Sequence, residues 1–104
     1  MSRKPLIPRA RARQDVEEAV DWYVAQRAPD AALRLIDSLE QAFAFIAERP
    51  AAGLPRHGEA LDIPGLRSWK LEGFPYLVFY IETATCIDVW RVLHERQDVP
   101  DKPG

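Results

Sequence analysis

The strongest signal in the pattern of apolar and polar positions is an uninterrupted apolar run, PYLVFYI, at residues 75–81. A run of aromatic and β-branched residues with no charge before Glu82 predicts a strand that is covered on both faces. CIDVWRVL at 86–93 predicts a second strand, and the polar ETAT between the two suits a hairpin loop. Upstream, RSWKL alternates polar and apolar residues and is separated from the run by Gly-Phe-Pro. These segments predict three successive antiparallel strands.

Two helical patterns precede these strands. From about Arg9 to Arg27, apolar residues recur at the i, i+3, i+4, i+7 spacing of one helix face. A longer stripe runs from about Pro29 to Glu48, and proline is favoured at the first position of a helix. Because only a few residues join them, the two helices must run antiparallel as a hairpin. Their apolar stripes predict that this hairpin lies across one face of the sheet.

Two shorter segments complete the expected fold. Lys4 to Pro8 includes an apolar stretch between prolines and predicts a short edge strand, whereas Pro50 to Gly65 is rich in proline and glycine and predicts a connecting loop. The predicted order is β-α-α-β-β-β. This is an α+β fold with a short N-terminal strand and a helical hairpin packed on one face of an antiparallel sheet. One domain is expected across 1–104, with 1–3 and 100–104 frayed.

Composition narrows the classes of function. The 104 residues are 47% hydrophobic and 29% charged, as is ordinary for a soluble globular protein. No apolar run approaches the ~20 residues of a membrane span, and the N-terminus lacks an apolar signal region, so we expect a cytoplasmic protein without a membrane partner. The single cysteine, Cys86, argues against a disulfide framework or a metal cluster, and no cofactor is expected. A net charge of −2 gives no support for direct, sequence-specific DNA binding by the chain alone.

Short motifs are spread along most of the chain. The most specific is RVLH at 91–94, followed by Asp98. The others, each weak by itself, are Asp15-Val16-Glu17-Glu18, Trp22-Tyr23, Glu48-Arg49-Pro50, Gly53 before Pro55-Arg56, Pro64-Gly65-Leu66-Arg67 and Tyr76-Leu77-Val78-Phe79-Tyr80. Together and in this order, they resemble the ParE branch of the RelE/ParE toxins from bacterial type II toxin–antitoxin modules of the plasmid-stabilisation type.

The resemblance implies a RelE/ParE-like fold and a small toxin that a co-expressed, ParD-like antitoxin neutralises. ParE-type members poison DNA gyrase, whereas RelE-type members cut messenger RNA in the ribosome. RNA cleavage without a metal needs an acid, a base and cations. The lysines are only at 4, 70 and 102, and no tyrosine follows Tyr80, so a lysine-rich catalytic cluster is not expected. His57 and His94 could form an acid–base pair, but nothing in their spacing brings them together.

We therefore expect a gyrase inhibitor that acts by binding and is not an enzyme. A RelE-type, ribosome-dependent mRNA endonuclease is the alternative, and a toxin-derived domain without potency is a third reading. The resemblance implies that gyrase is contacted by the last strand and the segment after it. Arg91 and His94 have a second reading, in which they pair with acidic neighbours and fix the end of the sheet. The candidate target-binding residues are Arg91, His94, Glu95, Arg96 and Asp98.

The apolar strand at 75–81 predicts where the antitoxin binds. Leu77, Phe79 and Ile81 point to one face and, being purely apolar, are expected under the helical hairpin. The other face is expected to stay uncovered and to form an amphipathic interaction surface, since tyrosine and tryptophan commonly anchor interfaces. The predicted antitoxin-binding residues are Trp69, Tyr76, Val78, Tyr80 and Trp90.

Overall fold

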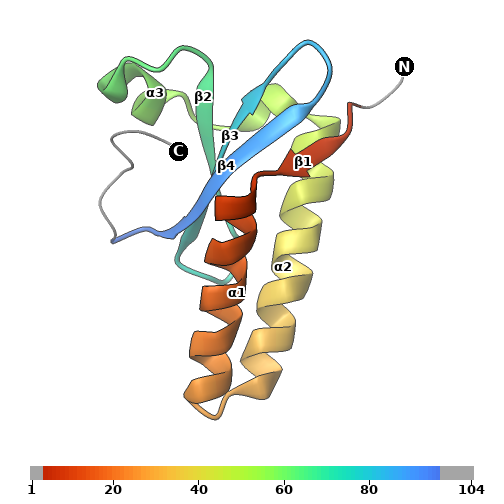
Figure 1. Ribbon diagram of the computed structural model, residues 1–104, viewed down its shortest axis with the longest axis vertical. Coiled ribbons are helices and arrows are strands. Elements are labelled where there is room, and N and C mark those ends of the chain that lie inside the picture. Colours follow the sequence, from red (N-terminus) through yellow and green to blue (C-terminus); the bar gives the residue numbers. More distant parts are fainter. Residues whose placement is uncertain (1–3, 97–104) are drawn as a thin grey trace.

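The computed structural model describes residues 4–96, in which a helical hairpin packs against a β-sheet (Figure 1). The expected fraying at 1–3 and 100–104 lies outside the described residues. The elements are β1 (Leu6–Pro8), α1 (Ala10–Ala25), α2 (Pro29–Glu48), the 3-10 helix η1 (Pro50–Ala52), α3 (Arg56–Leu61), β2 (Leu66–Lys70), β3 (Tyr76–Glu82) and β4 (Ile87–His94).

Across residues 4–96 the strands form a four-stranded sheet in the order β1-β4-β3-β2. The predicted antiparallel meander of β2, β3 and β4 is confirmed. The N-terminal strand is also confirmed, but it pairs in parallel with the outer edge of β4, from Leu6 opposite Ile87 to Pro8 opposite Val89. The sheet is therefore mixed rather than antiparallel throughout. Pro8 has no N–H to donate, which suits a strand at the edge of the sheet.

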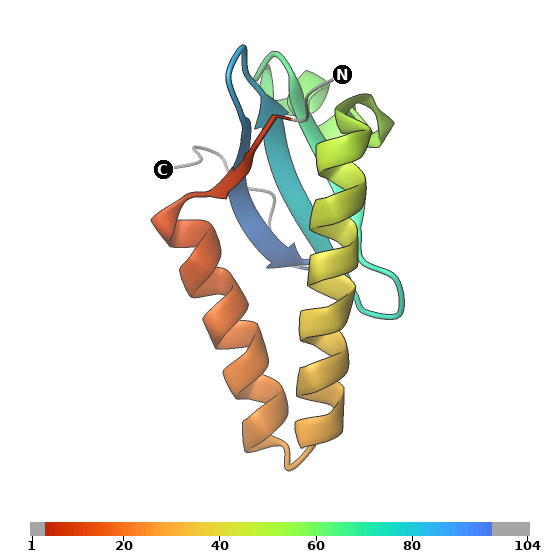
Figure 2. The ribbon, with the colours of Figure 1, turned by 90° about the vertical axis from the view of Figure 1, so that its right-hand side faces the viewer.

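The predicted helical hairpin is confirmed, and it covers one face of the sheet. Figure 2 shows α1 and α2 side by side in front of the strands, with the end that carries their connecting turn extending beyond the sheet. The apolar stripe of α2 supplies Leu35, Leu39 and Ile46, which are at most 4% exposed. Arg27 adopts a left-handed conformation (φ 56°) in the tight turn between the helices. Burial of this stripe against the sheet forms the main core.

The prediction of which sheet face lies under the hairpin is wrong. Val78 and Tyr80 have no exposed area and belong to the same core as the helix residues. Phe79 belongs instead to a second, smaller core on the opposite face, with Leu77 and Ile81 packed against it. A tyrosine can be buried completely when its hydroxyl is paired, and here that condition is met. We call the face that carries Phe79 the open face.

The hydroxyl of Tyr80 connects the sheet to the segment after α2. It accepts a hydrogen bond from Gly53 N at 3.0 Å and donates one to Pro50 O at 2.7 Å. A Cβ added at Gly53 would lie only 2.3 Å from the Tyr80 hydroxyl oxygen, so glycine is required for this close approach. Arg67 also donates to Gly53 O at 2.8 Å. Burial raises the pKa of Tyr80 above 10, and the network holds the chain across the end of β3.

The segment predicted as a loop, Pro50 to Gly65, contains two short helices, η1 and α3. Proline and glycine hide them from propensity arguments, because both are poor helix formers. Gly58 is nevertheless needed within α3, since a Cβ there would lie 2.6 Å from Leu66 O. Leu61 and Ile63 then pack against the open face. In Figure 2, α3 lies behind the sheet, on the side away from the hairpin.

Candidate functional site

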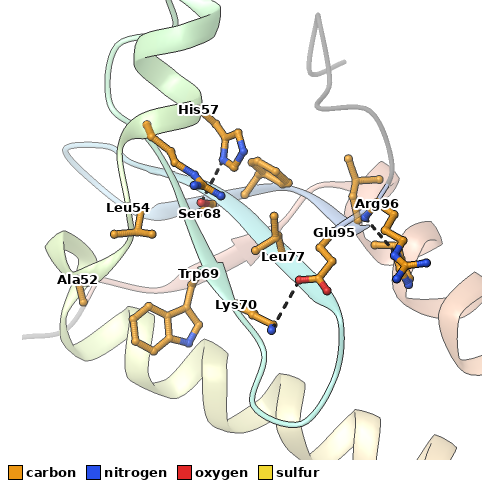
Figure 3. Close-up of a pocket in the computed structure, with 13 residues that line it drawn as sticks. Ala52, Leu54, His57, Ser68, Trp69, Lys70, Leu77, Glu95 and Arg96 are labelled. Atoms are coloured by element: carbon orange, nitrogen blue, oxygen red, sulfur yellow. Dashed lines mark hydrogen bonds and ion pairs between the residues drawn. The ribbon is translucent and has the colours of Figure 1, made fainter.

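A pocket of about 600 Å³ lies on the open face of the sheet (Figure 3). Its floor is apolar and is formed by Leu77, Phe79 and Leu93. Phe79 and Leu93 are only 2% and 6% exposed, because neighbouring side chains of the open face pack over them, so the accessible part of the floor belongs mainly to the half-buried Leu77. The remaining residues around the pocket are Ala52, Leu54, Arg56, His57, Ser68, Trp69, Lys70, His94, Glu95 and Arg96.

The pocket exists because α3 covers only part of the open face. Leu61 and Ile63 pack over the cluster that contains Leu66 and Phe79. Farther along β3, toward Leu77, the pocket opens instead. Figure 3 shows Leu77 in the middle of the view, with the side chains of β2 on one side and the end of β4 on the other. The site is thus a gap between α3 and the last residues of β4.

His57 of α3 borders the pocket on one side. Its Nδ1 lies 3.3 Å from the Ser68 hydroxyl of β2, and its ring meets Phe79 edge-on with centroids 5.3 Å apart. Burial lowers the pKa of His57 below 6.5, and the positive charge of Arg56 lowers this pKa further. The ring is therefore neutral at pH 7 and would gain a proton more readily if an anion came close.

The end of β4 and the residues after it border the pocket on another side. Lys70 Nζ lies 3.6 Å from Glu95 Oε2 in an exposed ion pair. The His94 ring meets Tyr76 edge-on with centroids 5.4 Å apart, and His94 Nδ1 accepts a hydrogen bond from Arg96 N at 3.1 Å. Burial raises the pKa of Tyr76 above 10, so this ring stays uncharged beside the histidine. Three of the predicted target residues, His94, Glu95 and Arg96, therefore come together here.

Arg91, another predicted target residue, forms an ion pair within the fold. Its Nε and Nη2 donate to the two carboxylate oxygens of Asp15 in α1, at 2.7 and 3.0 Å. Val92 N donates to the same carboxylate at 3.0 Å. The side chains of Arg91 and Asp15 are 16% and 4% exposed, and their hydrogen bond raises the pKa of Arg91. For Arg91, these contacts agree with the alternative interpretation of the sequence, in which it pairs with an acidic neighbour and fixes the end of the sheet. Asp98 lies outside the described residues.

The predicted antitoxin-binding residues do not form one exposed surface. Val78 and Tyr80 are buried under the hairpin, and Tyr76 packs against the same core. Trp69 stacks on Phe45 of α2, with ring centroids 4.7 Å apart, and reaches only the edge of the pocket. The expected surface does not form because the helical hairpin covers the face on which Tyr76, Val78 and Tyr80 lie.

Trp90 is the predicted antitoxin-binding residue that lies on the open face, where it packs against the Phe79 cluster. Its Nε1 donates to Asp88 Oδ2 at 2.9 Å, and the Arg9 guanidinium lies 4.5 Å from the centre of its ring. Arg9 also donates to Asp88 through Nε and Nη2, the latter at 2.9 Å. These contacts fix the indole beside β1.

Sequence reasoning missed the floor of the pocket, although the pairing of β3 with β4 contains a clue to which face of the sheet is open. Asp88 pairs with Ile81, so their side chains lie on the same face of the sheet. A carboxylate on the face of Ile81 argues that this face is not the one under the hairpin. Beyond this pair, Trp90 is the extra residue of a β-bulge opposite Phe79, which breaks strict alternation along β4. Alternation alone therefore misplaces the residues after Val89.

Within residues 4–96, no three His, Cys, Asp or Glu side chains lie close enough to hold a metal ion. No helix in that range is both long and apolar enough to cross a bilayer.

Comparisons with known proteins identify the family. The family model for the ParE toxin of the type II toxin–antitoxin system, parDE, matches residues 6–99. The chain belongs to the ParE toxin family. It is thus a ParE-type toxin of a type II toxin–antitoxin system, and the resemblance found in its motifs is confirmed.

The chain is also similar to two known proteins. A protein of Sinorhizobium fredii named "Putative toxin Y4kP" is 30% identical over 100 residues, which cover 96% of this chain and 97% of that protein. A solved structure of the chromosomal ParDE TA system from P. aeruginosa contains a chain with a TM-score of 0.74 and 22% identity. The match covers 88% of this chain and 95% of that chain. At this identity it establishes the fold alone, and it confirms the RelE/ParE-like α+β architecture.

Proposed function

We propose that this ParE-family toxin inhibits DNA gyrase by binding it, and that a ParD-like antitoxin neutralises the toxin by covering the open face of the sheet. The observation that carries the proposal is the pocket on that face, whose floor of Leu77, Phe79 and Leu93 is apolar. Leu54 at its edge is 58% exposed. An apolar surface of this kind is typical of an interaction site, and a partner segment that folds on binding could bury it.

The proposed antitoxin-binding surface therefore differs from the one expected from the strand pattern. It keeps Trp69 and Trp90, which lie at the edge of the pocket and on the open face. It replaces the buried Val78 and Tyr80 with the half-buried Leu77 and the exposed Leu54, which line the pocket together with the buried ring of Phe79. Leu54 follows η1, whereas Leu77 and Phe79 belong to β3. An extended or helical antitoxin segment that contacts all of them would cross the strands.

For the gyrase contact we propose His94, Glu95 and Arg96, with Asp98 retained from the sequence. The first three border the same pocket as the proposed antitoxin site. An antitoxin seated in the pocket would then cover part of the gyrase-binding surface, and neutralisation would follow from direct occlusion. Arg91 is not included, because its guanidinium is engaged by Asp15.

Two of the three lysines are paired with glutamates, which supports inhibition by binding rather than by catalysis. Lys70 pairs with Glu95, and Lys4, at the far side of the molecule, donates to Glu82 at 2.9 Å. One observation favours the second candidate function, a RelE-type endoribonuclease. His57 and His94, which the sequence did not bring together, border the same pocket, and two imidazoles near cations can serve as base and acid.

The decisive experiment compares two targets with antitoxin-free toxin. Supercoiling and cleavage-complex assays with purified gyrase are run beside translation in a cell-free system. We expect blocked supercoiling with normal translation. Blocked translation with cleaved messenger RNA and normal supercoiling would establish the endonuclease instead. If both assays stay normal, the chain is a toxin-derived domain without potency.

Matched arginine variants then test the target surface. Arg96→Ala is compared with Arg34→Ala, the same change at an exposed position of α2. We expect the first to weaken gyrase inhibition and the second to leave it unchanged. Equal inhibition by both variants would contradict the proposed gyrase contact.

A further inference from the structure

We propose that the pocket on the open face takes an acidic segment of the antitoxin, with an apolar side chain on the floor and a carboxylate at the rim, and that this binding places a proton on His57. The inference rests on the proposed function in one respect, the identity of the occupant.

The charge around the pocket is opposite in sign to that of the whole chain. The residues around the pocket include three cations, Arg56, Lys70 and Arg96, and one carboxylate, Glu95. The complete sequence has a net charge of −2. Positive charge is therefore concentrated at this site, which would attract an acidic segment on approach and pair with it on arrival.

The floor of the pocket accepts an apolar side chain. The half-buried Leu77 supplies apolar surface without hydrogen-bonding groups, the nearly buried Phe79 and Leu93 lie beneath it, and Leu54 adds exposed apolar area at the edge. The volume of about 600 Å³ is within the roughly 300–1,000 Å³ of typical ligand pockets. A partner that inserts an apolar side chain here brings the neighbouring groups of its backbone up to the charged rim.

His57 is the titratable group that responds to such a partner. On its own helix it faces Arg56, on β2 the Ser68 hydroxyl, and on β3 the Phe79 ring. Lys70, His94, Glu95 and Arg96 share the pocket with it. In the free protein, burial and Arg56 keep the imidazole uncharged at neutral pH by lowering its pKa. An incoming carboxylate favours the charged form and so raises that pKa in the complex.

The sign of the resulting pH dependence follows from proton linkage. If His57 binds its proton more tightly in the complex than in the free protein, complex formation takes up a proton. Affinity is then greatest below the pKa of the free protein and is lost as the pH rises through the pKa of the complex. Burial and the charge of Arg56 lower the pKa of His57 in the free protein, so affinity should fall as the pH rises from acidic to neutral.

An acidic peptide fits the pocket better than a nucleic acid. Among the lining residues, Lys70 is already paired with Glu95, so Arg56 and Arg96 are the cations left to meet an anion. Two guanidinium groups can pair with the one carboxylate of an acidic segment, whereas a nucleic acid brings a phosphate with every nucleotide. The net negative charge of the chain also opposes a polyanion. Single-stranded nucleic acid is the alternative ligand, and the test includes it.

The test uses a pair of small probes that share a phenyl group, 3-phenylpropanoate and its neutral amide, 3-phenylpropanamide. Both are titrated into the wild-type chain at pH 5.5 and 7.5 and followed by NMR of the backbone amides and of the His57 ring. We expect shifts at Leu77 and Phe79 with both probes. The carboxylate should bind three- to tenfold more tightly at pH 5.5 than at 7.5, since one pKa unit corresponds to about tenfold. The amide should show little change with pH.

Three variants complete the design. His57→Gln should keep carboxylate binding but lose its pH dependence, and the same spectra report whether the variant is folded. Arg96→Gln should reduce the preference for the carboxylate over the amide, whereas Arg34→Gln on α2 should not. In the wild type, carboxylate binding should raise the pKa of the His57 ring measured directly, which keeps the test informative even if His57→Gln unfolds.

Several results would overturn the proposal. These are equal binding of carboxylate and amide, shifts confined to another surface, and pH dependence that persists in a folded His57→Gln variant. Tighter binding of an oligothymidylate than of the carboxylate at the pocket would assign the site to nucleic acid instead. Because the probes require neither antitoxin nor gyrase, the inference can fail while gyrase inhibition stands, and the reverse is also possible.

Discussion

Replacing Arg91 with methionine tests whether a buried ion pair attaches the last strand to α1. The change removes the guanidinium but keeps a long apolar stem in a similar volume. Asp15, which is 4% exposed, then loses both hydrogen bonds from Arg91 and retains the one from Val92 N. Its nearest remaining cation is Arg11, whose Nε lies 4.0 Å away on a side chain that is 44% exposed.

The expected cost follows from this geometry. Removing one partner of a buried ion pair costs about 3–5 kcal/mol, because the other charge stays buried without compensation. The retained Val92 hydrogen bond and the nearby Arg11 put the expectation at the lower end, about 3 kcal/mol. A domain of this size is stable by about 5–15 kcal/mol in total. The variant should therefore fold but unfold at a clearly lower denaturant concentration.

The assay is equilibrium unfolding in urea, followed by far-ultraviolet circular dichroism and tryptophan fluorescence. Arg11→Met is the matched control, since Arg11 also approaches Asp15 but is largely exposed, and it should cost under about 1 kcal/mol. In a double-mutant cycle with Asp15→Asn, the two changes should be clearly non-additive, because each removes the same pair of hydrogen bonds.

A loss below about 1 kcal/mol for Arg91→Met, or additive losses in the cycle, would refute the assignment of Arg91 to the fold. The outcome also decides how toxicity data are interpreted. If Arg91→Met is strongly destabilised, its loss of toxicity reports a fold defect, whereas the same loss in a stable Arg96→Ala variant reports the target surface.

Three further outcomes are expected. Tyr80→Phe should cost about 1–3 kcal/mol in urea unfolding, because Gly53 N and Pro50 O lose their buried partner. Gly53→Ala should lower the melting temperature more than Tyr80→Phe does, since the added Cβ would lie 2.3 Å from the Tyr80 hydroxyl; an equal or smaller drop would contradict this packing. The pKa of His57 is lowered in the folded state, so its contribution to stability is complete above pH 6.5 and is lost as the pH falls below that value. The urea midpoint of the wild type should therefore fall more between pH 7.5 and 5.5 than that of His57→Gln, and parallel falls would rule out this role of His57.

The sequence by itself determined the family and the order of the strands and the two long helices, but not the short helices η1 and α3. Both helices, the antiparallel meander and the N-terminal edge strand follow from apolar periodicity and from proline and glycine positions, which are local properties of the chain. The motifs together, of which RVLH at 91–94 followed by Asp98 is the most specific, carried the resemblance to ParE toxins. Of the five target residues that the resemblance implied, three, His94, Glu95 and Arg96, come together at one pocket.

Only the tertiary structure decided which face of the sheet is covered and which is open. A strand whose two faces are both apolar does not show from its own sequence which of them meets the helices. The choice depends on partners distant in the chain: Gly53 and Pro50 satisfy the buried hydroxyl of Tyr80, and α3 supplies Leu61 to the opposite face. The same is true of Arg91, whose partner Asp15 lies 76 residues away. Hydrogen-bond partners and covering layers are long-range properties, and for that reason the pocket beside His57 became visible only in the folded chain.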